Sequence, residues 1–529
     1  MLNLNKYPTN CFSPAYQQIV CSLRADINDT EVNGRSPLQV LEGTEKLIKE
    51  ELVRCVWFGQ HIKKDKLYTD DGSRLEVLSP GWWNSEGGPD FKHAEILLEG
   101  KGLVKGNVEV HVFASDWMRH RHDKQNTYDS VCLHVVMWND HEERHITNSK
   151  GELILQLTLS EYLDAEIDEI VDIIDVESYI KGKKVSPGYC KTAIEERKID
   201  EQWIGRFLDY SGDERILQKA KRYGRWTERS TFEQTLYEAV MESLGYKNNK
   251  KPFLTLAAHV PLNTMQCIIP DDVSVREKKR YLQSLLFNMA GLFPSPEKHD
   301  THDEETSAYI KSIEHAWKRI RIEAGKIPLS KKEWSYAGIR PANFPERRIA
   351  AISNILSECM PAGIFRRLLS AFQKGKNGEA DRGSVRSVIN DILSIFLEAE
   401  DDYWSYHYTI GGKKLGRVQK LLGRERASVI LINVIVPLML VYARKQNDVE
   451  LEKLLHAVYG TCKPLPATSV IKFMNNRIFG RPKVSAGIVN SVRRQQGLYQ
   501  IFKDFCENNT ISCNKCAFYL FITKTGGSK

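Results

Sequence analysis

The sequence predicts a chain in two parts, an α/β domain followed by a larger all-α region. A length of 529 residues exceeds what a single hydrophobic core organises, so more than one domain is expected. Between residues 67 and 159, short apolar runs are separated by glycine, proline and asparagine, as strands and turns are. From about residue 188 onwards, amphipathic stretches recur at helical spacing.

These changes of pattern divide the chain into four segments. Residues 1–42 are polar and weakly periodic, and we expect a loosely ordered leader. Residues 43–187 form the α/β domain, which begins with a helix in TEKLIKEELVRCVWFGQHI and continues into a small mixed sheet. Residues 188–460 form a large helical domain, and residues 461–529 a basic helical tail with a cysteine cluster. No repeat period is present, so a regular solenoid is not supported.

The composition and the apolar runs favour a soluble protein. Hydrophobic residues make up 42% and charged residues 27%, as in ordinary globular proteins. The run ASVILINVIVPLMLVYA is short for a bilayer and contains Asn433 and Pro437, so it predicts a buried helix that kinks or ends near the proline. The first residues lack the pattern of a secretory signal. We therefore expect a cytoplasmic protein with no membrane contact.

The positive charge is concentrated at one end of the chain. Residues 471–529 contain ten Lys and Arg residues against two acidic residues, whereas the whole chain has a net charge of +7. A localised basic face suits a polyanion, and we expect nucleic acid as a partner, although a solvated surface is the commoner reason for a run of charge. Two further basic stretches, NNKKPF and TIGGKKLGRVQKLLGRER, lack the residue order of a phosphate-binding P-loop.

The stretch GGPDFKHAEILLEGKGLVKGNVEVH contains the main candidate site. The GGP turn delivers Asp90 to the start of one strand. In the next strand, alternation puts Glu109 and His111 on one face and the neighbouring valines on the other. Two carboxylates at one end of a sheet suit Mg²⁺ or Mn²⁺, which use few protein ligands and leave room for phosphate oxygens. A phosphodiester is the substrate class that this predicts.

Pro89-Asp90 and Glu109-Val110-His111 resemble the signature of the PD-(D/E)xK nuclease superfamily. The resemblance implies a restriction-endonuclease-like N-terminal domain and a metal-dependent nuclease or phosphodiesterase. It also implies a carboxylate on the preceding helix, for which Glu50 and Glu51 are alternatives and Glu51 is counted among the catalytic candidates. His111 stands where the superfamily usually has lysine, and an imidazole replaces that permanent positive charge only in part.

Histidines cluster directly after this motif. Asp116, His120 and His122 are candidates for contact with phosphate or substrate. On an extended loop the two histidines face one way, whereas on a helix they diverge. A zinc hydrolase of another substrate, with the metal at His111, His120 and His122, is a further alternative. His134, in the apolar run VCLHVV, predicts a core histidine with a hydrogen-bonded partner.

Three cysteines near the C-terminus, Cys506, Cys513 and Cys516, have the spacing C-x6-C-x2-C. The C-x2-C pair suits a structural zinc site, which we favour over an iron–sulfur cluster. Cys462 is the first candidate for a fourth ligand and Cys190 the second. Three unligated cysteines are the simpler alternative.

Several longer stretches resemble the bacterial domain-of-unknown-function 2851 family from about residue 43 onwards. They are GWWNSEGGPDF, GNVEVHVFASDWMRHRHD, YDSVCLHVVMWND, GYKNNKKPF, RPANFPERRIA and QGLYQIFKDFC. This resemblance implies no activity. Two functions therefore stand side by side: a metal-dependent nuclease or phosphodiesterase with a PD-ExH site, and a non-catalytic nucleic-acid-binding or scaffold protein that keeps a nuclease-like fold.

Overall fold

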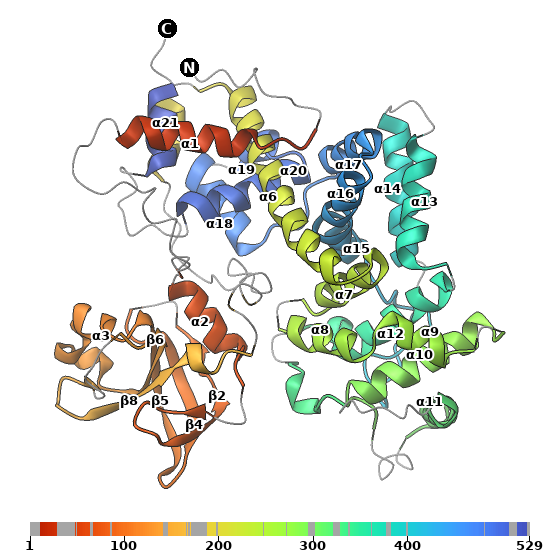
Figure 1. The fold of residues 1–529 in the computed structure, drawn as a ribbon, viewed down its shortest axis with the longest axis horizontal. Helices are drawn as coiled ribbons and strands as arrows, with labels where there is room; N and C mark the ends of the chain where they lie inside the picture. The colour runs from red at the N-terminus through yellow and green to blue at the C-terminus, as the bar shows by residue number, and fades with distance from the viewer. Residues whose placement is uncertain are drawn as a thin grey trace.

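The computed structural model describes most of the chain. The described residues are 11–28, 48, 50–63, 67–84, 87–140, 146–164, 167, 170, 188–196, 199–246, 248–270, 272–294, 302–320, 328–336, 339–360, 362–376, 382–397, 400–480, 482–506 and 516–525. Within them, an N-terminal sheet is followed by a region built almost entirely of helices (Figure 1). The predicted order of an α/β part and then an α part is confirmed.

The N-terminal domain is a mixed sheet with helix α2 (Glu50–Gly59) packed on it. Its strands are β1 (Leu67–Tyr68), β2 (Arg74–Ser79), β3 (Trp82–Trp83), β4 (Phe91–Leu98), β5 (Gly102–Phe113), β6 (Val131–Trp138), β7 (Ile146–Thr147) and β8 (Leu153–Thr158). The order in the sheet is β1-β2-β4-β5-β6-β8-β7, with β3 paired to β4. The β5–β6 and β6–β8 pairs are parallel and the other pairs are antiparallel.

The side chains of β5 alternate between the two faces of the sheet, as the sequence predicts. Val108 and Val110 are fully buried in the core shared with α2, and Glu109 and His111 lie on the opposite face. The parallel register places Glu109 beside His134, and His134 beside Gln156 of β8. One face of the sheet therefore carries a row of polar side chains across three neighbouring strands.

The polar segment between β5 and β6 forms short helical turns over this face. They are α3 (Asp116–Arg119), η4 (His122–Lys124) and η5 (Asn126–Tyr128). Trp117 is fully buried and its ring contacts those of His122 and His134. The indole thus anchors the segment to the polar row.

The rest of the described chain is helical. The larger core is formed mainly by α6 (Glu201–Arg229), α7 (Phe232–Leu244), α8 (Lys250–His259), α9 (Leu262–Ile268), α10 (Val275–Met289), α11 (Glu304–Ile320), α12 (Pro345–Cys359), α13 (Ile364–Lys376), α14 (Arg382–Leu397), α15 (Arg424–Ile430), α16 (Val436–Lys445) and α17 (Val449–Thr461). A second helical core is formed by α1 (Ala15–Asn28), α5 (Tyr189–Glu196), the start of α6, α18 (Ser469–Phe479), α19 (Pro482–Ile488), α20 (Val492–Ile501) and α21 (Ala517–Thr525).

One continuous helix, Arg424–Lys445, is long and apolar enough to cross a membrane, and 67% of its apolar window is buried inside the protein. That degree of burial is typical of a core helix, as the sequence predicts. A π-helical turn, Leu431–Ile435, interrupts it just before Pro437. Proline has no N–H for the helical ladder, and a π turn is a local way to absorb the mismatch.

The segment 1–42 differs from the expected leader where it is described. Residues 15–28 form helix α1, because apolar residues recur there at helical spacing. Ala15, Tyr16, Ile19 and Val20 are buried against α5, α6 and the C-terminal helices. The two ends of the described chain therefore share one core (Figure 1), and residues 1–10 and 29–42 lie outside the described residues.

The basic C-terminal segment is not simply a solvated charged surface, because two of its arginines pair with carboxylates of α6. Helix α20 packs along α6, where Arg493 forms hydrogen bonds of 2.8 and 2.5 Å with the fully buried Asp213. Arg494 pairs with Asp209 at 3.1 Å. The carboxylates that pair with Arg493 and Arg494 come from residues 280 and 285 positions earlier, so a local count of charges misses them.

Arg494→Ala is expected to lower the free energy of unfolding of the helical region by about 2 kcal/mol, because the partly buried Asp209 loses charged hydrogen bonds. Urea denaturation followed by circular dichroism measures this change. Lys453→Ala, which removes an exposed pair with Glu450, is the control and is expected to cost roughly 0–1 kcal/mol. Equal effects of the two substitutions would show that the α6–α20 pair is only a surface contact.

Candidate metal site

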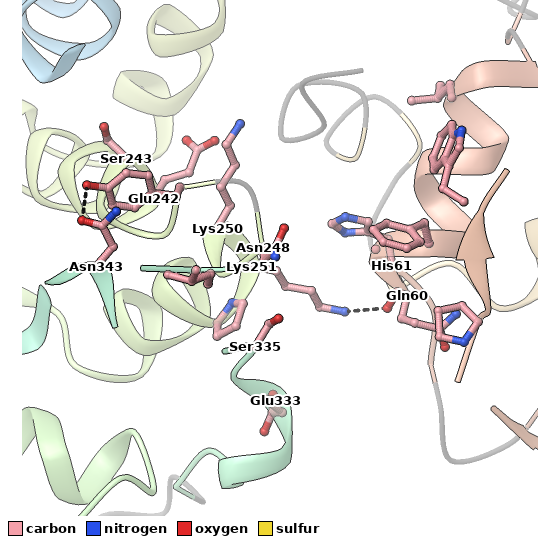
Figure 2. Close-up of a pocket in the computed structure, with 18 of the residues that line it drawn as sticks. Gln60, His61, Glu242, Ser243, Asn248, Lys250, Lys251, Glu333, Ser335 and Asn343 are labelled. Atoms are coloured by element: carbon pink, nitrogen blue, oxygen red, sulfur yellow. Dashed lines mark hydrogen bonds between the residues drawn. The ribbon is translucent and has the colours of Figure 1, made fainter. Parts of the chain in front are cut away.

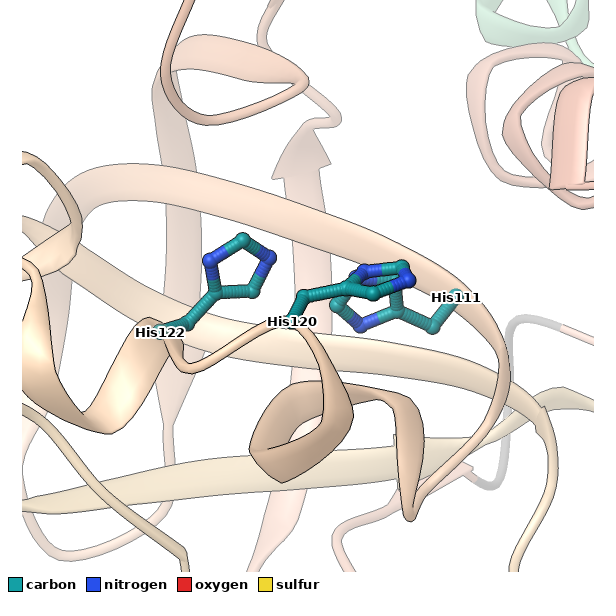
Figure 3. A group of neighbouring side chains, drawn as sticks. All are labelled: His111, His120 and His122. Atoms are coloured by element: carbon teal, nitrogen blue, oxygen red, sulfur yellow. The ribbon is translucent and has the colours of Figure 1, made fainter. Parts of the chain in front are cut away.

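Three histidines converge on the polar face of the sheet. His111 comes from β5, while His120 and His122 come from the segment that follows α3 (Figure 3). One ring nitrogen from each lies within 4.8 Å of the other two. Such a spacing allows all three to reach a single metal ion.

The backbone conformation explains why both later histidines point at His111. Helix α3 ends at Arg119, and Arg121 adopts a left-handed conformation with φ of 59°. This turn breaks the helical spacing that would send His120 and His122 in different directions. A non-glycine residue with positive φ is uncommon, and such residues gather at functional sites.

His122 is the histidine with the fewest constraints on its ring nitrogens. Its side chain is buried, and neither ring nitrogen has a hydrogen-bond partner. Its Nε2 lies 3.5 Å from Glu109 Oε1, and the His111 Nε2 lies 3.7 Å from the same oxygen. Burial lowers the pKa of His122, and burial together with His134 lowers the pKa of His111 well below its usual value. Neutral imidazoles are the form that binds metals.

A chain of hydrogen bonds determines which nitrogen of His111 carries a proton. The carboxylate of Asp70 can only accept hydrogen bonds. It accepts one from Gln156 Nε2 at 2.7 Å and another from the hydroxyl of Thr158. Gln156 Oε1 must then accept from His134 Nδ1, 2.9 Å away. His134 Nε2 is left as an acceptor for the Nδ1–H of His111, also at 2.9 Å.

It follows that the Nε2 of His111 presents a lone pair toward the cluster. In the structure it accepts from His120 Nδ1 at 3.1 Å, and it is the atom that a metal would bind. Orientation of a ligand imidazole by a hydrogen bond on its other nitrogen is the usual arrangement in metal sites. His134 is fully buried and burial lowers its pKa to about 3, so the predicted core histidine with a hydrogen-bonded partner is confirmed.

The two predicted carboxylates also meet, next to an arginine. Asp90 donates its backbone N–H to Glu109 Oε2 at 2.9 Å, and its carboxylate accepts from the backbone N–H of Val110. Burial raises the pKa of Glu109 to about 8, and burial and the nearby Glu109 raise the pKa of Asp90 well above its usual range. Arg54 of α2 places its Nε 2.9 Å from Asp90 Oδ2. The guanidinium thus lies beside one of the two carboxylates to which the sequence assigns a magnesium ion.

The remaining acidic candidates are Glu50, Glu51 and Asp116. Arg54 also pairs with Glu50, one helical turn earlier, so Glu50 is the α2 carboxylate that reaches the acidic pair. Glu51 instead lines the cleft between the domains. Asp116 is buried, accepts from the backbone N–H of Phe113 at 3.1 Å and pairs with Arg119, so it holds α3 in place.

Residues 50–464 match a family model described as a protein of unknown function, DUF2851. The chain belongs to this family. The match covers the histidine cluster, the acidic pair and the hydrogen-bond chain to Asp70, and the family description states no activity. No curated protein and no solved structure matches the chain.

Cys506, Cys513 and Cys516 lie outside the match to DUF2851, whereas the two candidates for a fourth ligand, Cys190 and Cys462, lie within it. Cys462 packs against the larger helical core, where burial raises the pKa of its thiol to about 12, whereas Cys506 and Cys516 belong to the second core. Cys513 lies outside the described residues. Among the described residues, the one group of three or more side chains spaced to hold a metal is the histidine cluster. Zinc at the cysteines stays a prediction.

Three residues of the candidate site were not found from the sequence. Arg54 carries a local signal, because it lies four residues after Glu50 on one helix face. Asp70 and Gln156 carry none, since their roles depend on the pairing of β8 with β6 and of the β1–β2 turn with β8.

Proposed function

We propose that the N-terminal domain is a metal-dependent hydrolase of phosphodiesters in nucleic acid, and that His111, His120 and His122 bind its metal ion. The convergence of their ring nitrogens within 4.8 Å, beside a carboxylate, carries the proposal. Three histidines with an open fourth position are a ligand set of catalytic zinc sites. A bound ion would supply positive charge to a phosphoryl oxygen and favour the ionisation of water.

Side chains around the cluster have roles that fit this chemistry. Glu109 has a pKa raised to about 8 and lies beside two of the three ligands, so it is placed to take or give a proton near neutral pH. Arg54, which pairs with Asp90 and Glu50, adds a permanent positive charge that acts on His111 and would favour an approaching phosphate. His120 is exposed and marks the side from which substrate reaches the cluster.

The choice of metal follows from the donor atoms. Imidazoles favour Zn²⁺ and related transition metals, whereas Mg²⁺ and Mn²⁺ favour carboxylates. Mg²⁺ at Asp90 and Glu109 requires Arg54 to leave Asp90. We therefore favour a transition metal at the histidines over Mg²⁺ or Mn²⁺ at the acidic pair.

The second candidate function is a non-catalytic protein that binds nucleic acid or acts as a scaffold. The ion pair of Arg54 with Asp90 and the burial of both carboxylates favour it, because a buried, neutralised pair needs no metal. Both proposals assume that the protein is soluble and cytoplasmic.

Cleavage assays separate the two functions. Labelled single- and double-stranded DNA and RNA are incubated with Zn²⁺, Mn²⁺ or Mg²⁺ and with chelator. A metal-dependent nuclease cleaves at least one of these, stops in chelator, and loses activity in Glu109→Gln but not in the exposed control His315→Ala. Binding without cleavage under every metal would support the scaffold. Cleavage of a small aryl phosphodiester but of no nucleic acid would support a hydrolase of another substrate.

A further inference from the structure

A large cleft separates the N-terminal domain from the helical region. Its volume is about 3210 Å³, and it is lined by α2, β2 and β3 on one side and by α7, α8 and α15 on the other (Figure 2). Lys251 spans it, with its Nζ 3.3 Å from the carbonyl of Gln60 and paired with Asp164. None of the three histidines lines the cleft.

The cleft has a strong surplus of positive charge. Twelve Lys and Arg residues line it, against six Glu and no Asp, and one of the twelve, Lys251, pairs with Asp164 outside the lining. Basic residues on one concave surface create the potential that attracts a polyanion. The two basic stretches that lack P-loop order both contribute to it, through Lys250, Lys251, Lys420 and Arg426.

The helical wall contains arginines whose charge has no acidic partner. The guanidiniums of Arg426 and Arg348 lie 3.3 and 5.3 Å from the centre of the Tyr246 ring. Their hydrogen bonds go to neutral groups, among them the carbonyls of Ser243 and Leu421. In the described part of the chain neither arginine forms an ion pair, and the buried Nε of Arg348 lacks a hydrogen-bond partner. An anion would relieve the repulsion between these charges.

The opposite wall offers a flat aromatic surface. Trp82 of β3 is 75% exposed, and its ring contacts no other ring among the described residues. Exposed tryptophan in a basic groove provides a stacking platform for unpaired bases. A base in a duplex is already stacked, so Trp82 favours a single strand.

We propose that this cleft binds a single strand of nucleic acid, with phosphates at Arg426 and Lys420 and a base stacked on Trp82. The ligand class rests on the proposed function, but the surface is separate from the histidine cluster. The cleft would hold the strand while another segment of it reaches the cluster.

Fluorescence anisotropy of a labelled single strand of about 20 nucleotides, with chelator present, measures binding without cleavage. Arg426→Gln is expected to weaken binding about tenfold and to reduce the slope of log K against log salt by about 0.7. Trp82→Ala is expected to weaken binding about tenfold with the slope unchanged. Arg276→Gln, an exposed arginine outside the cleft, is the matched control and should bind as wild type.

Lys420→Ala changes an exposed side chain, so weakened binding by this variant supports the proposal even if Arg426→Gln is unstable. The proposal is overturned if the wild-type protein binds no strand, if Lys420→Ala and Arg426→Gln bind like Arg276→Gln, or if millimolar inorganic phosphate displaces the strand completely. Binding that is lost in His122→Ala but kept in both cleft variants would place the strand at the histidine cluster and would also overturn it. Intact cleft binding without any cleavage supports the cleft and refutes only the proposed hydrolase.

Discussion

His122→Ala is expected to reduce the affinity for Zn²⁺ by at least about 100-fold, more than the loss of a residue that only supports a ligand. His122 contributes one of three converging imidazoles, and neither of its ring nitrogens is used in a hydrogen bond within the fold. The substitution therefore removes a ligand without breaking a hydrogen bond. Competition with a chromophoric zinc chelator measures the affinity.

His315→Ala, which removes an exposed histidine in α11, is the control and should bind Zn²⁺ like the wild-type protein. Circular dichroism checks that the sheet persists in His122→Ala. Unchanged zinc affinity in a folded His122→Ala protein would contradict the assignment of the ligands, because two histidines alone hold zinc weakly.

Gln156→Leu is expected to lower zinc affinity about 10- to 100-fold although Gln156 lies too far along the hydrogen-bond chain to touch the metal. Leucine has nearly the same size but cannot connect Asp70 to His134. Without that connection the proton of His111 is free to occupy Nε2, the nitrogen that faces the cluster. The same chelator competition measures the loss.

A tautomer readout distinguishes this effect from simple destabilisation. Nitrogen-15 chemical shifts should report the Nδ1–H form of His111 in the wild-type protein and a mixture of forms in Gln156→Leu. The matched control is Gln500→Leu, which changes another buried glutamine, in the second helical core, whose amide donates to a carboxylate, that of Asp504. Equal zinc affinity in the two variants would contradict a positioning role for Gln156.

Local patterns predicted the fold class and part of the site. Period-two alternation put Glu109 and His111 on one face, and the apolar context of His134 indicated its burial. The convergence of His120 and His122 was left open, because it depends on a left-handed Arg121 where no glycine marks the turn. Sequence periodicity cannot show such a backbone choice.

Pairings between distant segments account for what the sequence did not show. Arg54 pairs with Asp90, one of the two carboxylates to which carboxylate spacing alone assigned a metal ion. The sequence alone counts Arg493 and Arg494 as part of a basic surface. In the structure they pair with Asp213 and Asp209 of α6. A charge count over one stretch of the sequence includes the arginine of each pair but not its distant carboxylate, whereas the effect of the charge depends on both.

The most direct test of the central claim is an anomalous diffraction measurement at the zinc edge on crystals of the zinc-loaded protein. The account predicts one peak per chain, about 2.0–2.1 Å from one nitrogen each of His111, His120 and His122. A peak at the carboxylates of Asp90 and Glu109 instead, or no peak in the N-terminal domain, would contradict it.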